Sequence, residues 1–350
     1  MTPLTPILVT GGYGFMGSHF IRGLYHKYPH YKIVNLDLLT YAGNPENLAD
    51  IEALEAALPL EKRRYEHVRG DVADAQFVNQ IFSQYRFAQV YHFAAESHVD
   101  RSIFNFGDFV RTNIEGTRVI FEAVRFHNVP RMVHISTDEV YGNVPTGFSL
   151  ESAPMNPSNP YAASKASADM LVRTYAETYK LPIVAVRSGN NYGTHQYPEK
   201  LIPLTITNLI EGKTIPVHGT GEHKRSWVHV HDFCRAVDLI AHTPSAVGAY
   251  NIAGEHKTNL EVIELVARSL GRDFRKSVSF VNDRPIADLR YAPHAGKIER
   301  ELGWRREHSI EGTMPNIVKW YLENGSWWQA IKEKKEFMDH YEKQSKALWY

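Results

Sequence analysis

The chain has 350 residues, which is long enough for an α/β core domain and a smaller second domain. Its 39 basic and 39 acidic residues balance, so no net charge attracts nucleic acid or an anionic membrane surface. We therefore expect a small-molecule ligand, with no nucleic acid and no membrane as a partner. The single cysteine, Cys234, excludes an intramolecular disulfide. With no leader-like segment and no apolar run of about 18 residues, the composition predicts a cytoplasmic protein.

The amino-terminal segment predicts a strand, a glycine turn and a helix in succession. Residues 7–10 are apolar, residues 11–17 read Gly-Gly-Tyr-Gly-Phe-Met-Gly, and a helical pattern follows. Gly11 and Gly14 let the turn close and let the backbone approach a pyrophosphate, while Gly17 lets the helix pack on the sheet. We expect this turn, including Phe15 and Met16, to bind a dinucleotide.

A second predicted strand, residues 32–37, ends on Asp37. A carboxylate at this position accepts hydrogen bonds from the adenosine ribose and repels a 2′-phosphate, so the sequence favours NAD over NADP. Leu38 and Thr40 follow directly and belong to the same expected site. A surface aspartate beside an ordinary glycine turn is the alternative, but strand, helix and acid have the spacing of a cofactor site.

Further strand-like runs end at Asp71, Ala95, Thr137 and Arg187, with helical patterns between them. This alternation predicts right-handed βαβ units and a Rossmann-type, doubly wound parallel sheet, whose ligands gather at the carboxyl ends of the strands. Asp71 and Val72 are then expected to bracket the adenine, although an acid at a strand end is also a common helix cap. The middle of the cofactor should be lined by Phe93, Ala94, Ala95 and Ser97.

The regular alternation stops near residue 190, where prolines and glycines separate shorter elements. We predict an NAD-binding domain over residues 1–189 and a smaller α/β substrate-binding lobe mainly over 190–330. Residues of about 226–253 are expected to return to the first domain, and 331–350 to form a helical tail.

The chemistry is expected around Thr137-Asp138-Glu139 and the pair Tyr161/Lys165. Tyr161 and Lys165 lie one helical turn apart, so the ammonium is expected to lower the pKa of the phenol and make it a general base. A simple alcohol oxidation needs one acid-base group, so Asp138 and Glu139 indicate a further proton transfer. A solvated Tyr-x-x-x-Lys face and a helix-capping acid pair are the alternatives.

The 18 histidines do not predict a metal site. No pair has a metal-site spacing supported by cysteine or carboxylate partners, and His223, His229 and His231 alternate as residues of a strand do. We expect no metal.

These motifs together resemble the extended short-chain dehydrogenase/reductases and, within them, the dTDP-glucose 4,6-dehydratase family. The finer strings are Ala-Ala-Glu-Ser-His-Val-Asp-Arg-Ser at 94–102, Thr-Asp-Glu at 137–139, Asn-Asn-Tyr-Gly at 190–193, Gln-Tyr-Pro-Glu-Lys-Leu-Ile-Pro-Leu at 196–204, Tyr-Asn-Ile at 250–252, Asp-Arg-Pro at 283–285, Trp-Tyr-Leu at 320–322 and Trp-Trp at 327–328. They occur in the family's order from about residue 7 to residue 328. Related epimerases and decarboxylases typically lack the Asp-Glu dipeptide after the threonine, so its presence distinguishes the dehydratases from them.

The resemblance implies an NAD-dependent hydro-lyase that converts a nucleoside diphosphate glucose into its 4-keto-6-deoxy derivative. Tyr161, helped by Lys165, removes the proton of the 4-hydroxyl as NAD takes the C4 hydride, and Thr137 steadies the C4 oxygen. Glu139 then abstracts the C5 proton, Asp138 protonates the departing C6 hydroxyl, and the hydride returns to C6. Thr112 and Asn191, with Tyr161 and Lys165, complete the implied cofactor contacts.

The resemblance also implies a set of residues that hold the sugar and the nucleoside diphosphate. Cations in it suit phosphates as a point charge or a bidentate fork. The set is Ser97, Thr137, Asn190, Lys200, Leu201, Pro203, Leu204, Pro216, His218, Arg225, Asn259, Asp283 and Arg284.

The chain departs from the family pattern at Gly189, Ser226, Ile286 and Ala287. These departures fall in the nucleotide region, so thymidine is favoured but a uridine, cytidine or guanosine sugar, or an N-acetylated sugar, stays open. A nucleotide-sugar 4-epimerase and a non-catalytic dinucleotide sensor are the competing functions. Residues 109–126 and 162–179 are predicted as long helices that, in the resembling family, pair with a second subunit, which implies a homodimer.

Overall fold

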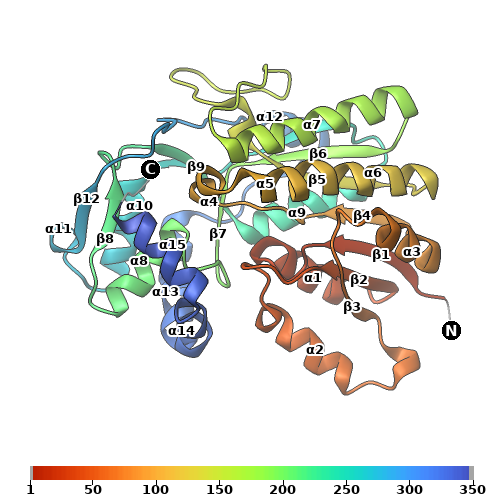
Figure 1. Cartoon of the computed structure of the whole chain (residues 1–350), viewed down its shortest axis with the longest axis horizontal. Helices are drawn as coiled ribbons and strands as arrows, with labels where there is room; N and C mark the ends of the chain where they lie inside the picture. The colour runs from red at the N-terminus through yellow and green to blue at the C-terminus, as the bar shows by residue number, and fades with distance from the viewer. Residues whose placement is uncertain (1–2, 347–350) are drawn as a thin grey trace.

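The computed structural model describes residues 3–346, and within them seven parallel strands form one sheet (Figure 1). The order β10-β6-β5-β4-β1-β2-β3 contains the doubly wound arrangement and confirms the predicted α/β fold. Asp71 and Ala95 lie in loops just beyond β3 and β4, which end two and three residues earlier than predicted. The strands are β1 Thr5–Thr10, β2 Tyr31–Asp37, β3 Tyr65–Arg69, β4 Gln89–His92, β5 Met132–Thr137, β6 Ile183–Ser188 and β10 Gly248–Ile252.

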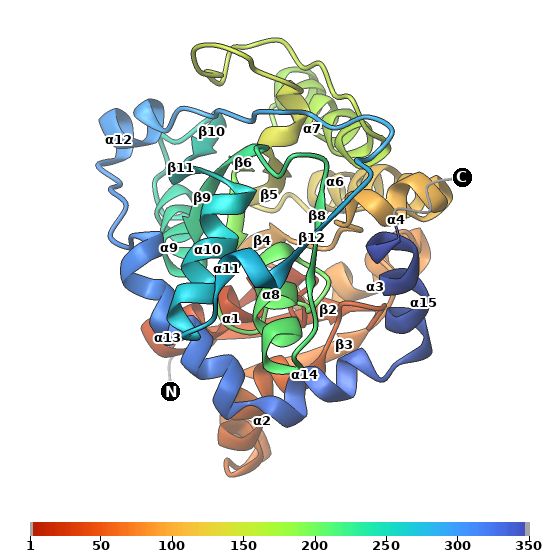
Figure 2. The same ribbon diagram turned by 90° about the vertical axis from the view of Figure 1, so that its left-hand side faces the viewer.

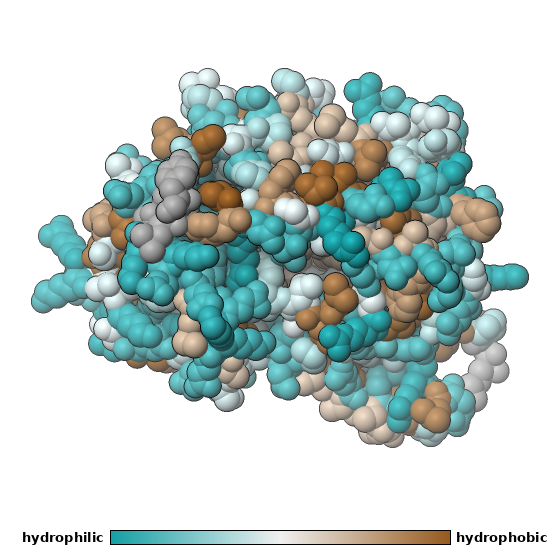
Figure 3. All heavy atoms as spheres, in the orientation of Figure 1, coloured by the Kyte–Doolittle hydropathy of each residue, from teal (hydrophilic) through white to brown (hydrophobic). Residues whose placement is uncertain are grey.

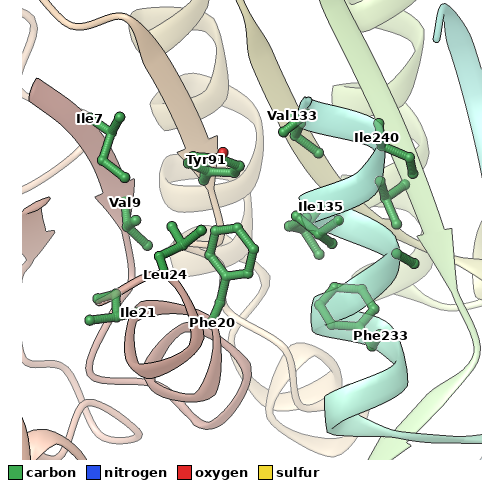
Figure 4. Packing of buried hydrophobic residues seen from close by; sticks show 14 of the residues in the cluster. Ile7, Val9, Phe20, Ile21, Leu24, Tyr91, Val133, Ile135, Phe233 and Ile240 are labelled. Atoms are coloured by element: carbon green, nitrogen blue, oxygen red, sulfur yellow. The ribbon is translucent and has the colours of Figure 1, made fainter. Parts of the chain in front are cut away.

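Successive strand residues point to opposite faces of this sheet, and both faces are apolar. Ile7 and Val9 pack with helices α1 and α9 on one face (Figure 4), whereas Leu8 packs with α3, α6 and α7 on the other. Burial on both faces explains why the strands read as continuous apolar runs. The helices are α1 Phe15–Lys27, α2 Ala49–Ala56, α3 Ala75–Tyr85, α6 Thr117–Phe126, α7 Pro160–Tyr179 and α9 Val230–Ala241.

The helix predicted over residues 109–126 is not a continuous α-helix, which corrects that expectation. Helix α5 (Phe106–Phe109) is followed by a π-helical segment, Val110–Gly116, before α6 begins. The side chain of Asn113 in this segment donates to the Glu96 carbonyl and to the Ser164 hydroxyl, at 2.9 and 2.8 Å. These buried hydrogen bonds compensate for the irregular backbone, as is common where π-helical turns border functional sites.

A smaller lobe lies at the carboxyl ends of the strands and faces the viewer in Figure 2. Its core packs helices α8, α10 and α13 around Trp227 and Trp328. Its elements are β7 Asn190–Tyr192, α8 Leu201–Ile210, β8 Ile215–His218, β9 Lys224–His229, β11 Glu255–Thr258, α10 Asn259–Ser269, α11 Phe274–Ser277, β12 Val278–Val281, α13 Ile310–Glu323 and α14 Gly325–Lys332.

The chain crosses between the two parts more than once. After β9, helix α9 packs beside α1 and β10 joins the main sheet next to β6, before β11 pairs with β9. The other elements are α4 Val99–Phe104, α12 Gly296–Leu302, α15 Lys335–Ser345 and the 3₁₀ turns Pro45–Leu48, Leu60–Lys62 and Asp138–Tyr141. Over residues 3–346, no helix combines the length and the hydrophobicity needed to cross a membrane.

Candidate active site

A cavity of about 290 Å³ lies at the carboxyl ends of the parallel strands, where the sequence predicted the cofactor. Every residue predicted to contact the cofactor lines it. They are Gly11, Gly14, Phe15, Met16, Gly17, Asp37, Leu38, Thr40, Asp71, Val72, Phe93, Ala94, Ala95, Ser97, Thr112, Tyr161, Lys165 and Asn191.

Two positions of the glycine turn, Gly11 and Gly17, leave no room for a side chain. Gly11 has φ +69°, and a Cβ there would lie 2.7 Å from the backbone of Ala94 in the loop after β4. A Cβ on Gly17 would lie 2.3 Å from the carbonyl oxygen of Gly11. The amino end of α1 is therefore open to backbone contact, so these residues fit the pyrophosphate of a dinucleotide.

Asp37 is held at the end of β2 by two backbone amides. Tyr13 N–H donates to Oδ2 at 2.9 Å, and Leu39 N–H donates to Oδ1 at 2.8 Å. Burial raises the pKa of Asp37, and these two hydrogen bonds oppose that rise. The carboxylate is thus fixed at the cavity wall with acceptor capacity left for ribose hydroxyls.

A second cavity, of about 170 Å³, adjoins the first on the side of the smaller lobe. Both cavities are lined by Ser97, Glu139, Asn190, Glu199 and Lys200, so they meet at the proposed catalytic dipeptide. Of the predicted substrate contacts, Pro203 is the exception, because it is buried in α8 and lines neither cavity. Thr137 lines the first, and the second is lined by Ser97, Asn190, Lys200, Leu201, Leu204, Pro216, His218, Arg225, Asn259, Asp283 and Arg284.

Asp138 is buried, with 2% of its surface exposed, in the turn that follows β5. Its Oδ1 accepts a 3.4 Å hydrogen bond from Thr137, and its Oδ2 has no hydrogen-bond partner among the described residues. Burial and then the charge of Glu139 raise the pKa of Asp138 well above its usual range. The geometry therefore favours a protonated Asp138, which suits a proton donor.

Glu139 lines both cavities, and its pKa is raised overall. Burial raises its pKa, while the charge of Arg225 and a hydrogen bond from Asn159 lower it. Asn159 Nδ2 donates to Glu139 Oε2 at 3.2 Å, and the Tyr291 hydroxyl lies 3.3 Å from the same oxygen. Burial raises the pKa of both acids, and that of Asp138 is raised well above its usual range, so Asp138 is the better proton donor and Glu139 the better base of the pair.

The structure contradicts the predicted effect of Lys165 on Tyr161. Lys165 Nζ donates to the Ile135 carbonyl at 2.6 Å, and burial lowers the pKa of Lys165 to about 8. Burial, then the charge of Glu139, raises the pKa of Tyr161, with a hydrogen bond from Thr137 opposing the rise. The protein groups alone therefore favour the neutral phenol, because burial and the charge of Glu139 both disfavour a phenolate there.

Sequence reasoning missed several residues that complete the site. Asn159 caps α7 through the Ala162 amide while it contacts Glu139, and its position before Pro160 is a helix-start signal that could have found it. Tyr291 also donates to Asp288 Oδ2 at 2.7 Å, and its ring lies 4.3 Å below the Arg225 guanidinium. No local pattern identifies Tyr291, because it lies in an irregular segment far along the chain.

The absence of a metal stays a prediction. Among residues 3–346, two groups of side chains lie close enough to share an ion, His229/His231/His308 and His98/Glu199/His340. In the first, the rings of His229 and His308 stack at 4.4 Å, so their ring-plane lone pairs do not converge. In the second, burial and then the positive charge of Arg101, with a smaller contribution from Lys200, lower the pKa of His340 to about 4, and these two positive charges would also oppose a bound cation.

Two of the departures from the family pattern touch each other. A Cβ on Gly189 would lie 2.5 Å from the carbonyl oxygen of Ser226, and the Ser226 hydroxyl accepts a hydrogen bond from the Gly254 amide at 2.9 Å. A larger residue at 189 would therefore require β9 to shift. The two substitutions act as one packing unit beneath Asn190 and Arg225.

Comparison with known proteins agrees with this geometry. A family model described as GDP-mannose 4,6 dehydratase matches residues 8–317. A dTDP-glucose 4,6-dehydratase from Streptomyces niveus is 43% identical over 335 residues, covering 94% of this chain and 96% of the relative.

Solved structures show the same relationship. A dTDP-glucose 4,6-dehydratase from Streptomyces venezuelae, solved with NAD and dTDP bound, is 44% identical with a TM-score of 0.88 and covers 94% of this chain and 100% of its own. A UDP-glucose 4-epimerase from Thermotoga maritima has a TM-score of 0.82 at 26% identity, covering 91% and 99%. The chain thus shares its fold with the epimerases, and its higher sequence identity to the dehydratases distinguishes these two groups of relatives.

Proposed function

Because this chain belongs to the nucleotide-sugar 4,6-dehydratase family, and within it to the dTDP-glucose 4,6-dehydratases, we propose that it converts dTDP-glucose into dTDP-4-keto-6-deoxyglucose with NAD as its cofactor. One observation carries the proposal. Glu139 lines both cavities and Asp138 lines the first; burial raises the pKa of both, but the pKa of Asp138 is raised well above its usual range, while Arg225 and Asn159 oppose the rise at Glu139. An oxidation alone would need neither group.

The first step is oxidation at C4. Tyr161 accepts the proton of the 4-hydroxyl, and Thr137, within hydrogen-bond reach of Tyr161, orients the C4 oxygen. When bound, NAD would supply the acceptor for the C4 hydride, the store from which that hydride goes to C6, and a positive charge that favours the Tyr161 phenolate. Lys165 anchors α7 to β5 through Ile135 and so fixes the phenol relative to Thr137.

The second step is loss of water across C5 and C6. The C4 ketone acidifies C5, so Glu139 removes the C5 proton while protonated Asp138 gives its proton to the leaving C6 hydroxyl. When the hydride returns to C6, Glu139 gives a proton back to C5. Transfer of the Tyr161 proton to Asp138 then restores both groups, and the balance of the cycle is the loss of one water.

A panel of nucleotide sugars tests which nucleotide and which sugar the enzyme accepts. Purified protein is incubated with the glucose conjugates of dTDP, UDP, CDP and GDP and with UDP-N-acetylglucosamine, and products are weighed by mass spectrometry. We expect loss of one water from dTDP-glucose at the highest rate. Faster dehydration of another sugar would replace the nucleotide assignment and leave the reaction class intact.

The 4-epimerase is the second candidate, because its fold is the same. An epimerase also oxidises C4 but returns the hydride to the same carbon, so its product keeps the C6 hydroxyl and the mass of the substrate. A product of unchanged mass would favour it. The buried acid Asp138 has no role in such a reaction.

We also propose a homodimer that pairs through α5, α6 and α7. Large apolar side chains on these helices are exposed, and Figure 3 shows hydrophobic surface gathered over them. They include Phe106, Phe126, Met170 and Tyr179. Light scattering should give twice the 40.0 kDa chain mass, and the mass of one chain at micromolar concentration would reject the dimer.

A cytoplasmic location is proposed on the basis of the thiol. Cys234 is free, and burial raises its pKa, so it needs no oxidising compartment. Fractionation of the native host, with the protein followed by antibody, tests this location. Recovery outside the cytoplasm would contradict it.

A further inference from the structure

Helix α15 packs against both parts of the molecule. Phe337, His340 and Gln344 are buried at a spacing of three and four residues, which places them on one face of the helix. The His340 ring lies 4.8 Å from that of His98 next to α4, and the Tyr341 hydroxyl accepts from Asn208 of α8 at 2.9 Å. Figures 1 and 2 both place α15 beside α4. The helix therefore spans the two walls of the second cavity.

Gln344, near the end of α15, lines this cavity and contacts a buried ion pair. Its Nε2 donates to Asp100 Oδ2 at 3.0 Å. The same carboxylate receives two hydrogen bonds from Arg284, from Nε to Oδ1 and from Nη2 to Oδ2 at 3.3 Å. Gln344, Asp100 and Arg284 thus form a chain from the tail helix to the cavity wall.

The environment of Asp100 makes each of its donors important. Asp100 is fully buried, so its charge depends on nearby donors and cations. Oδ2 receives its shorter hydrogen bond from Gln344 and its longer one from Arg284. Without the amide of Gln344, Arg284 would have to turn toward Asp100 to satisfy that oxygen, away from a ligand in the cavity.

We propose that Gln344 is a positioning residue for nucleotide-sugar binding, which holds Asp100 and through it fixes the Arg284 guanidinium on the wall of the second cavity. The inference rests on the proposed function, because it assigns Arg284 to the nucleotide sugar. It makes α15, a helix of the carboxyl-terminal tail, a part of the substrate site.

The test replaces Gln344 by Met, which keeps the length and volume of the side chain and removes the donor. Gln329→Met, the same change at an exposed position of α14, is the matched control. Binding of dTDP to the NAD-loaded enzyme is measured by calorimetry, with steady-state kinetics, bound NAD and thermal unfolding alongside. We expect the dTDP affinity of Gln344→Met to fall roughly 5-fold to 10-fold. KM should rise in parallel, kcat should change by less than about twofold, and bound NAD should not change.

A double-mutant cycle separates positioning from general loosening of the helix. With Asp100→Asn already present, Gln344→Met should weaken dTDP binding further by less than about twofold, because the two residues act through one contact. Gln344→Glu packs similarly but places a carboxylate beside Asp100, and it is the second variant if Gln344→Met folds poorly. It should bind dTDP at least as weakly as Gln344→Met does.

The outcomes are distinct. Wild-type dTDP affinity in both Gln344 variants, or an equal loss in Gln329→Met, would overturn the inference and leave the proposed function standing. If the wild-type enzyme binds neither dTDP nor UDP, CDP or GDP, the proposed function fails and this inference fails with it.

Discussion

The Lys165 ammonium and the Ile135 carbonyl oxygen lie 2.6 Å apart in a buried hydrogen bond between α7 and β5. This bond fixes the helix that carries Tyr161 to the strand that ends at Thr137. The lysine thus orients the phenol mechanically, while the charges that face the phenol come from Glu139 and Asp138. The acid-base behaviour of Tyr161 is set by its whole surroundings and not by the lysine one turn away.

Tyr161→Phe should abolish C4 oxidation while NAD stays bound, because the ring remains and only the proton acceptor is lost. General-base catalysis contributes about 10²-fold to 10⁴-fold, so turnover should fall at least about 100-fold. Steady-state rates and bound NAD measured on the same preparation check this. Turnover above about a tenth of wild type would rule out Tyr161 as the base.

Glu139→Gln should stop the reaction after oxidation. The amide cannot accept the C5 proton, so the reduced nicotinamide should accumulate in absorbance while the sugar C5 hydrogen fails to exchange with heavy water. Glu222→Gln, at an exposed glutamate, is the control and should react normally. Rapid C5 exchange in the Glu139 variant would show that another base acts.

Asp138→Asn should stabilise the protein relative to wild type, increasingly as the pH rises above about 4. The folded-state pKa of Asp138 is raised, so above that pH the folded protein holds a proton that the unfolded chain has released. The free energy of unfolding of wild type therefore falls as the pH rises to the folded-state pKa, and Asn avoids this loss because it does not ionise.

Urea unfolding of wild type and Asp138→Asn at about pH 5 and about pH 8 measures the difference. The advantage of the variant should be larger at the higher pH, although its dehydration rate should fall by at least about 100-fold. An equal difference in the free energy of unfolding between the variant and wild type at both pH values would mean that Asp138 is ionised in the folded protein.

Asp37→Asn should narrow the preference for NAD over NADP by about 10-fold or more, because it removes the charge that repels a 2′-phosphate and keeps the shape of the side chain. Dissociation constants of both dinucleotides, measured on cofactor-free protein, give the ratio. Asp50→Asn, at an exposed carboxylate of α2 paired with Arg22, is the control. An unchanged ratio in Asp37→Asn would remove Asp37 from cofactor selection.

The cofactor side of the site could be predicted from the sequence because its determinants are local. Gly11, Gly17 and Asp37 act through turns and a strand end that lie within one βαβ unit. The same holds for Thr137, Asp138 and Glu139, which follow one strand. In each case the residues that form the recognisable sequence pattern are also the residues that build the turn or strand end.

The remaining features depend on contacts between distant segments. Tyr291 reaches Glu139 across 152 residues, and Gln344 reaches Asp100 across 244. The π-helical segment places Asn113 against partners in other elements. The raised pKa of Tyr161 reflects burial and then the charge of Glu139, which spacing along α7 does not reveal. Sequence periodicity describes single elements, so it does not predict these contacts.

The central claim is that one hydride leaves C4 and returns to C6 within a single turnover. The direct measurement is incubation of the purified enzyme with dTDP-glucose deuterated at C4, followed by mass spectrometry and NMR of the product. The account predicts a product that has lost one water and carries the deuterium at C6, with no added NAD consumed. A product of unchanged mass, or deuterium released in free NADH, would contradict it.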